Sequence, residues 1–212
     1  TYVMQTGFAP GGQLVYPAMG AVVALKIGQR GNLPPYVTVT SPLGRFSEAG
    51  FLGPSYKPFA TGGDPNAQRF VVQGLVPPGG ITKQRLQRRR TLLEKLDSIE
   101  EKTGPEKKFL EADSYRKKAY DLILGEAKKG FDLSEEDPSL RDLYGRNRYG
   151  QSFLLARRLI EHGVPFVTVN WGGWDTHKEH FQRMSRMLPI LDQAFSALLK
   201  DLAERDLLKK TV

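Results

Sequence analysis

The chain has 212 residues, of which 40% are hydrophobic, enough to bury one substantial core. No apolar run reaches the roughly 18 residues that a membrane-spanning helix needs, and the lack of cysteine excludes disulfides, thiol redox chemistry and thiolate metal sites. The formal net charge of +8 arises largely between residues 81 and 130, and the composition predicts one soluble globular unit.

The first third of the chain predicts a helix and two short strands separated by a long loop. A Pro in the first turn and a Gly at the end predict a helix over 17–27. Clusters of β-branched and aromatic residues predict strands over 36–40 and 69–73. The segment 41–68 is rich in Gly, Pro and Ser but also apolar, so we expect an ordered loop that packs against the core.

A mostly helical segment is predicted over about 82–162. Its first helix begins near the start of the segment, and a second is expected over 106–129. A third helix is expected over 139–162, with Gly163 just beyond its C-terminus. His162, at the end of this third helix, is interpreted as a favourable C-terminal cap.

A buried strand over 164–170 follows, and then a long amphipathic helix with apolar residues at helical spacing from Met184 to Leu202. Strands that alternate with helices of this length favour an α/β fold with a largely parallel sheet flanked by helices on both faces. Residues 211–212 are expected to begin a further strand. The chain 1–212 is therefore expected to be a single, incomplete α/β domain.

The candidate site lies in the turn between the last strand and the last helix, within VPFVTVNWGGWDTHKEH. In a parallel sheet, ligands collect beyond the carboxyl ends of the strands, where Asp175 and His177 fall. Thr176 and Glu179 have the spacing of a capping box, which predicts Thr176 as the helix N-cap and an anion-binding helix N-terminus beside it. A carboxylate beside an imidazole predicts part of a divalent metal site, whose other ligands must come from elsewhere.

Two interpretations of this turn remain open. Asp, Thr and His at a strand–helix junction are also common as caps, so an ordinary structural turn competes with a catalytic or ligand-binding loop. The catalytic or ligand-binding interpretation is favoured because residue types that are rare in this chain cluster here: both Trp residues and two of the three His residues lie within 171–180. His180 is a possible additional ligand, since it follows His177 by three residues and would share its side of the first helical turn.

Three other segments are weaker candidates. KQRLQRRR, residues 83–90, has enough charge to contact phosphates, but an apolar face, nearby acidic residues and a lack of aromatic residues favour a solvated helix face. No nucleic-acid partner is therefore predicted. Arg146 and Arg148 could bind an anion, although the neighbouring glycines favour a turn or close helix packing. Residues 51–59 fit either a pocket wall or a packed loop.

The stretch RDLYGRNRYGQSFLLARRLIEHGVPFVTVNWGGWDTH resembles a segment typical of the bacterial family called domain of unknown function 1501. The resemblance extends through LPILDQAFSALLKDLAERDLLKKTV and, more loosely, back to GAVVAL and LPPYV, so it covers most of the chain. The family is grouped with the alkaline phosphatase and sulfatase superfamily, whose α/β enzymes use bound metal ions to hydrolyse phosphate or sulfate esters. The resemblance implies an alkaline phosphatase-like fold and suggests that chemistry.

The family's Gly-Trp-Asp-Thr-His motif matches Gly173 to His177, which implies that Asp175 and His177 hold a divalent metal ion: zinc, calcium, manganese or magnesium. His180 stands where the family usually has Asn. Family members commonly begin earlier, often with a twin-arginine export signal, and continue further. The resemblance thus implies a periplasmic or extracellular protein, of which this segment carries an incomplete and inactive site.

The substrates implied by the resemblance are small-molecule or polysaccharide sulfate or phosphate esters. An alternative of a different class is a noncatalytic exported binding or surface protein that keeps the sulfatase-like fold. The two hypotheses differ in whether further Asp and His side chains converge on Asp175.

Overall fold

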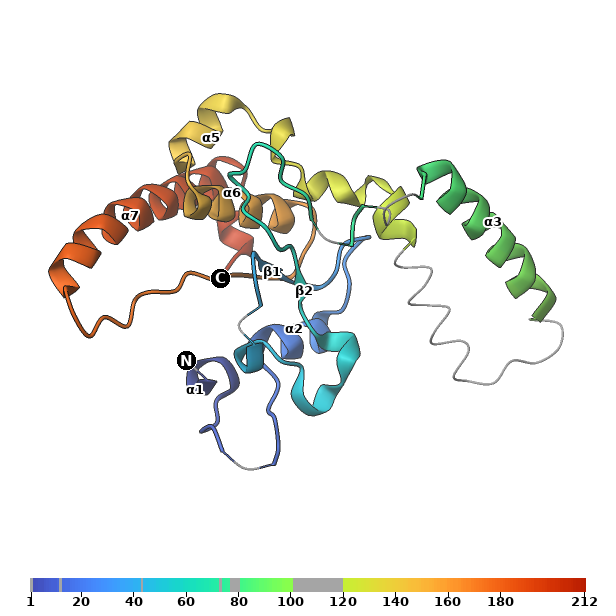
Figure 1. The fold of residues 1–212 in the computed structure, drawn as a ribbon, viewed down its shortest axis with the longest axis horizontal. Helices are drawn as coiled ribbons and strands as arrows, with labels where there is room; N and C mark the ends of the chain where they lie inside the picture. Colours follow the sequence, from blue (N-terminus) through green and yellow to red (C-terminus); the bar gives the residue numbers. More distant parts are fainter. Residues whose placement is uncertain (1, 12, 43, 73, 77–80, 101–119) are drawn as a thin grey trace.

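The computed structural model describes residues 2–11, 13–42, 44–72, 74–76, 81–100 and 120–212. A three-stranded parallel sheet lies at the centre, in the order β2 (Phe59–Ala60), β1 (Tyr36–Val39) and β3 (Phe166–Val169) (Figure 1). β1 pairs with β3 along its whole length, whereas β2 adds only two residue pairs. The expected α/β architecture with a parallel sheet is confirmed.

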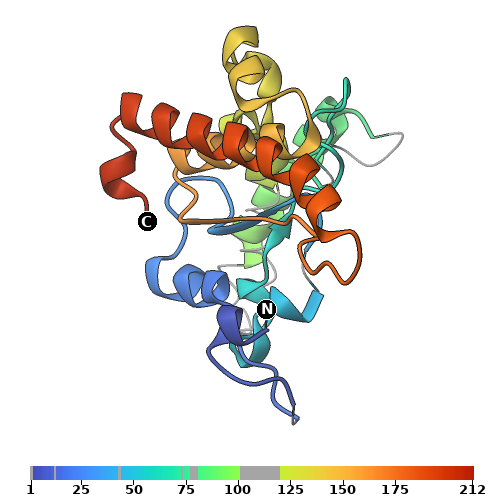
Figure 2. The same cartoon turned by 90° about the vertical axis from the view of Figure 1, so that its left-hand side faces the viewer.

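Helices cover both faces of this sheet (Figures 1 and 2). On one face, α2 (Met19–Ile27) packs against β1 and β3. On the other face, α6 (Arg148–Glu161) packs against the same strands, and α7 (His180–Glu204) packs across α6. The core lies mainly between α6 and the sheet, because this is where completely buried apolar side chains from both meet: Val37, Val39, Leu154, Leu155 and Leu159.

The remaining helical elements are shorter or lie further from the sheet. Among the described residues they are α1 (Tyr2–Thr6), α3 (Lys83–Glu100), a helical stretch over 120–124, α5 (Pro138–Tyr144) and the 3-10 turns Gly44–Phe46, Gly50–Leu52, Pro54–Tyr56, Glu126–Phe131, Leu133–Glu135 and Leu208–Lys210. In α3, Leu86 is buried while Arg85, Arg88 and Arg89 are exposed, which confirms the solvated basic helix face.

The prediction of a strand over 69–73 is wrong. Residues 69–72 have no strand structure, and residue 73 lies outside the described residues. Val72 is buried, and its carbonyl oxygen accepts a hydrogen bond from the Leu75 N–H (3.2 Å). Val72 therefore packs into the core from a turn and not from a strand. The strand that does join the sheet is β2, inside the segment expected to be a loop. Two residues are too few to produce a periodic pattern.

The described part of the segment 82–162 is mostly helical, as expected, but it is divided differently. Much of the helix expected over 106–129 lies outside the described residues, since only 120–129 are described. Of these, residues 120–124 are helical, and the chain then enters the 3-10 turn Glu126–Phe131, so the expected α-helix does not reach 129.

The helix predicted over 139–162 is two helices, α5 and α6. Gly145 follows α5 with φ of 93°, a conformation that ends a helix, and Asn147 then caps α6. At the other end, the Nδ1 atom of His162 lies 2.9 Å from the Arg158 carbonyl oxygen, and Gly163 has φ of 87°. The cap interpretation of His162 and the stop at Gly163 are therefore confirmed.

Residues 211–212, expected to begin a strand, are not part of the sheet. They follow the 3-10 turn Leu208–Lys210, and the N–H of Thr211 donates to the Leu208 carbonyl oxygen, although the backbone of Thr211 is extended. An extended conformation becomes a strand only when a neighbouring strand pairs with it.

Candidate metal site

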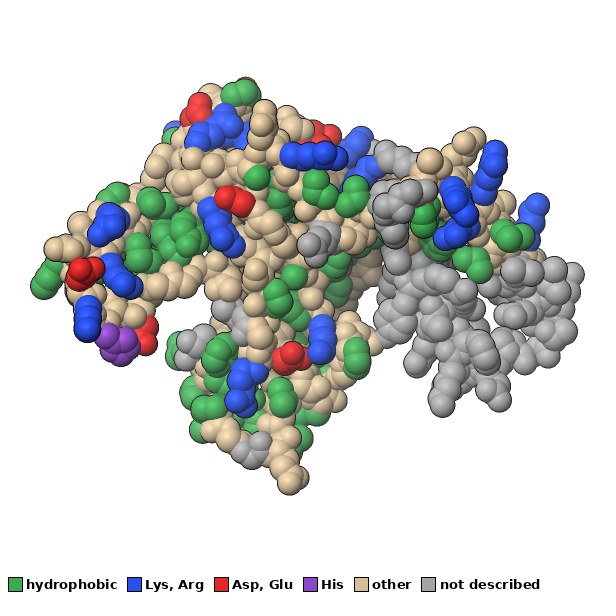
Figure 3. Space-filling model, viewed as in Figure 1, with side chains coloured by type: hydrophobic (Ala, Val, Ile, Leu, Met, Phe, Trp, Pro, Cys, Tyr) green, Lys and Arg blue, Asp and Glu red, His purple; other side chains and the backbone are tan. Residues whose placement is uncertain are grey.

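The loop that joins β3 to α7 carries every residue predicted for the site. It leaves the carboxyl end of β3 and runs over the surface to the outer end of α7 (Figure 1). Gly173 has φ of 92°, which favours glycine, and a Cβ atom built on Gly172 would meet no heavy atom within 4 Å. The loop is therefore open to solvent. Figure 3 shows histidine, acidic and basic side chains close together on this outer end of the molecule.

Asp175 and His177 lie side by side in this loop. The Nε2 atom of His177 is 3.3 Å from the Oδ2 atom of Asp175, and the two side chains are 84% and 91% exposed, respectively. In a tetrahedral site with bonds of about 2.1 Å, two ligand atoms are roughly 3.4 Å apart, so the pair fits two adjacent positions around one metal ion. The same distance also suits a simple ion pair, which adds little stability at such exposure.

The prediction that Thr176 is the N-cap of the helix is wrong. α7 begins at His180, and its N-cap is Glu179, whose φ of 54° and ψ of 35° are left-handed. This conformation breaks the turn, so no side-chain capping bond forms, and the Thr176 hydroxyl lies 2.6 Å from the Nδ1 atom of His180 instead. His177 consequently precedes the helix and does not share a helical turn with His180. The anion-binding role of Thr176 stays a prediction.

A complete metal shell is not assembled by the residues that the structure describes. Among them, no three His, Cys, Asp or Glu side chains form a group that could hold a metal ion. Structural zinc sites use four protein ligands and catalytic ones about three, so Asp175 and His177 supply part of a site. Nδ1 of His180 already contacts Thr176, which leaves Nε2 as the nitrogen that could bind a metal.

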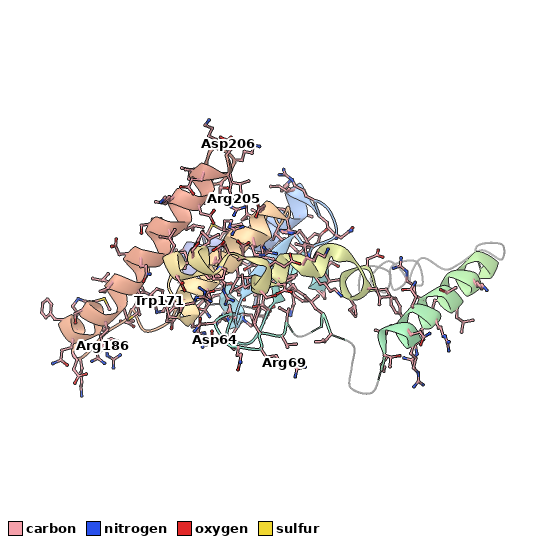
Figure 4. All side chains as sticks on the ribbon, turned by 90° about the horizontal axis from the view of Figure 1, so that it is seen from above. Asp64, Arg69, Trp171, Arg186, Arg205 and Asp206 are labelled. Atoms are coloured by element: carbon pink, nitrogen blue, oxygen red, sulfur yellow. The ribbon has the colours of Figure 1, made fainter. Side chains whose placement is uncertain are left out.

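Three aromatic rings, which we call the aromatic cluster, hold the loop against α6. Trp171 stacks on Tyr149 with centroids 3.8 Å apart and planes at 10°, and Trp174 meets Trp171 edge-on at 5.2 Å and 63°. Tyr149 lies in the first turn of α6, so Trp171 is fixed to the body of the molecule (Figure 4). The sequence showed two Trp residues in the loop, but it gave no signal that Tyr149 joins them.

The carboxyl edge of the sheet also contains a strained residue beside this loop. Thr40, directly after β1, has φ of 71°, which is rare for a β-branched side chain, and its N–H donates to the Thr61 hydroxyl (2.8 Å). Asn170, directly after β3, donates from Nδ2 to the Ser41 carbonyl oxygen (3.4 Å). Strain of this kind collects at functional sites, which supports this edge as the functional one.

A hollow of about 550 Å³ lies elsewhere, between the segments around Phe70 and Phe131, and none of the predicted site residues line it. Two of its charged groups are engaged in the fold, since Arg141 donates from Nε to Gln151 (2.8 Å) and Asp132 accepts from the Ser134 N–H (2.9 Å). We therefore place the candidate site in the loop, where Asp and His side chains meet at a sheet edge.

The two arginines flanking Asn147 behave differently. Arg146 contacts Asp142 and donates from Nη2 to the Pro138 carbonyl oxygen (2.9 Å), which confirms the structural turn favoured for this segment. Arg148 is exposed in the first turn of α6.

The sequence pattern of one protein family, described as "Protein of unknown function (DUF1501)", matches residues 1–212, and the chain belongs to this family. No curated protein and no solved structure matches the chain. Within the described part of the chain, none of the helices has both the length and the apolar character needed to cross a membrane.

Proposed function

We propose that this protein is a metal-dependent hydrolase of sulfate or phosphate esters with an alkaline phosphatase-like fold. The observation that carries the proposal is the 3.3 Å approach of Asp175 Oδ2 to His177 Nε2, beyond the carboxyl end of a parallel strand. That edge of a parallel sheet is where α/β proteins bind ligands. The strained Thr40 and the open space around Gly172 fit the same location.

In this proposal Asp175 and His177 are two ligands of one divalent ion, and further ligands complete the shell. A divalent ion bound there supplies Lewis acidity, which polarises a phosphoryl or sulfuryl oxygen and activates a bound water or alcohol. Among zinc, calcium, manganese and magnesium, an imidazole ligand favours zinc, because calcium and magnesium prefer oxygen ligands. The substrates are small-molecule or polysaccharide esters.

The family resemblance also leads us to propose that the protein acts in the periplasm or outside the cell. Fractionation of cells that express the natural gene tests this location, with a cytoplasmic enzyme as the marker. Protein found only with that marker would contradict export.

The metal proposal is tested by metal content. We expect plasma mass spectrometry to find stoichiometric metal in the purified product of the natural gene, and less than half of it in the Asp175→Ala and His177→Ala variants of that product. Sulfatase and phosphatase assays on the same samples should show activity falling with the metal. The metal content of His180→Ala tests the possible additional ligand separately from the two expected ones.

Asp206→Ala is the matched control, because Asp206 is an exposed carboxylate beyond the opposite end of α7 (Figure 4). It should keep both metal and activity. Equal metal content in wild type, Asp175→Ala and His177→Ala would contradict the proposal and favour the noncatalytic binding or surface protein. Metal bound without any ester hydrolysis would also favour that alternative.

A further inference from the structure

The aromatic cluster lies in the same loop as the candidate metal pair. Trp174 directly precedes Asp175, and Trp171 lies three residues further back, after the end of β3. Any ester held by Asp175 and His177 would therefore place its organic part near these rings. The loop has room for such a group, since the space around Gly172 is open.

The three rings have different roles. Tyr149 covers one face of Trp171 by stacking on it at 3.8 Å, so this pair anchors the loop. Trp174 meets Trp171 edge-on, and it keeps 36% of its surface exposed. Stacking on Tyr149 accounts for the position of Trp171, whereas part of Trp174 is left accessible to a ligand.

The angle between the two indoles indicates the shape of the group that they accept. A slot between parallel rings would select a flat aromatic group, but Trp171 and Trp174 meet at 63° and form an angular surface. The negative face of an aromatic ring attracts polarised C–H groups, and a sugar ring presents several of them on a face that is not flat. Asp175, which directly follows Trp174, and Lys178 in the same loop are exposed polar residues whose side chains suit sugar hydroxyls.

We propose that Trp174, supported by Trp171 and Tyr149, is the binding platform for the sugar ring of a carbohydrate sulfate or phosphate ester. This inference rests on the proposed function of Asp175 and His177, because it names the substrate class of that site. Trp174 acts in binding, and the ester group lies on the side of Asp175.

Both Trp residues of the chain belong to this platform, so tryptophan fluorescence reports on it directly. The 212-residue chain is titrated with glucose 6-sulfate, in the presence of a chelator so that no turnover occurs. We expect a saturable change in tryptophan emission. Trp174→Leu, which keeps an apolar side chain without an aromatic face, should weaken binding by roughly 5- to 10-fold, whereas Trp174→Phe should stay within about 2-fold of wild type.

Phenyl sulfate and inorganic sulfate serve as competing probes, and circular dichroism checks that each variant is folded. No saturable change with glucose 6-sulfate, an equal affinity for inorganic sulfate, tighter binding of phenyl sulfate, or unchanged binding by Trp174→Leu would each overturn the inference. Binding is read without metal or turnover, so a failure of the hydrolase proposal is seen separately.

Discussion

Gly20 is the residue at which α2 meets the sheet. A Cβ atom built there would lie 2.5 Å from the Cε2 and Cζ atoms of the Tyr36 ring, and that ring is itself packed edge-on against Phe166. Burial, opposed by the Thr168 and Thr38 hydroxyls, raises the pKa of Tyr36. The absence of a side chain at Gly20 therefore sets the distance between α2 and β1.

We expect Gly20→Ala to destabilise the protein. The clash should cost about 1–3 kcal/mol, partly offset by up to about 1 kcal/mol from the better helix propensity of Ala. Urea unfolding followed by circular dichroism measures the change. Val22→Ala, at an exposed position of the same helix, is the control and should change the free energy of unfolding much less. A Gly20→Ala variant more stable than wild type would contradict the close approach.

At the level of elements, the start of α6 links the helical segment to the candidate site. The Oδ1 atom of Asn147 accepts hydrogen bonds from the N–H groups of Tyr149 (3.0 Å) and Gly150 (2.9 Å). These bonds fix the first turn of α6, and Tyr149 in that turn stacks on Trp171. The position of the loop that carries Asp175 therefore depends on a helix cap in another part of the sequence.

Asn147→Ala should lower the free energy of unfolding by about 1 kcal/mol through loss of the cap. It should also change the tryptophan emission of the folded protein, because Trp171 loses a well-placed partner. Asn147→Asp keeps an acceptor oxygen at the same position and should retain most of the stability and the emission. If Asn147→Ala lost stability but left the emission unchanged, the coupling between the cap and the loop would be disproved.

In the whole molecule, a buried ionic network joins α5, α6 and α7. Arg157, with no exposed side-chain surface, contacts Glu136 (Nη2 to Oε2, 2.7 Å) and Asp201 (Nε to Oδ2, 2.8 Å). The Tyr144 hydroxyl donates to Asp201 (2.9 Å), and burial together with that carboxylate raises the pKa of Tyr144. Arg205, at the C-terminal end of α7, completes the network by contacting Asp201 (Nε to Oδ1, 2.6 Å). Arg205 and Trp171 lie toward opposite ends of α7 (Figure 4).

Glu136 makes this network sensitive to acid. Burial alone would raise the pKa of Glu136, but hydrogen bonds and charges from Arg157 and Arg158 outweigh burial and hold it below its ordinary value. An unfolded Glu, with a pKa of about 4.3, takes up a proton before the folded one does. The stabilisation is therefore complete above that pH and is lost as the pH falls through the lower folded value.

We expect Glu136→Gln to be less stable than wild type at pH 7, because it removes the carboxylate that two buried arginines share. The difference should shrink as the pH falls below the pKa of an unfolded Glu, about 4.3, and then through the lower folded value, where wild type also loses the charge. Urea unfolding at a series of pH values measures both. Glu204→Gln removes an exposed carboxylate of α7 and should show neither effect. A gap that stayed constant down to pH 2 would contradict the lowered pKa.

The sequence by itself determined the α/β class, the family, and the elements that have continuous patterns. These include α2, β1, β3 and most of α7, because helical or strand periodicity is carried by neighbouring residues. It also located the loop that holds Asp175 and His177, since a strand followed by glycines and polar residues is a local signal. The metal role of those residues stays a prediction.

Tertiary structure alone decided the features that depend on distant residues or on one backbone conformation. β2 is a strand because Val37 and Thr38 pair with it, not because its two residues form a pattern. Packing selects the left-handed conformations of Gly145 and Glu179, which divide α5 from α6 and delay the start of α7. The stacking of Trp171 on Tyr149, 22 positions earlier in the chain, follows from the antiparallel run of α6 and β3, which no local window of sequence contains.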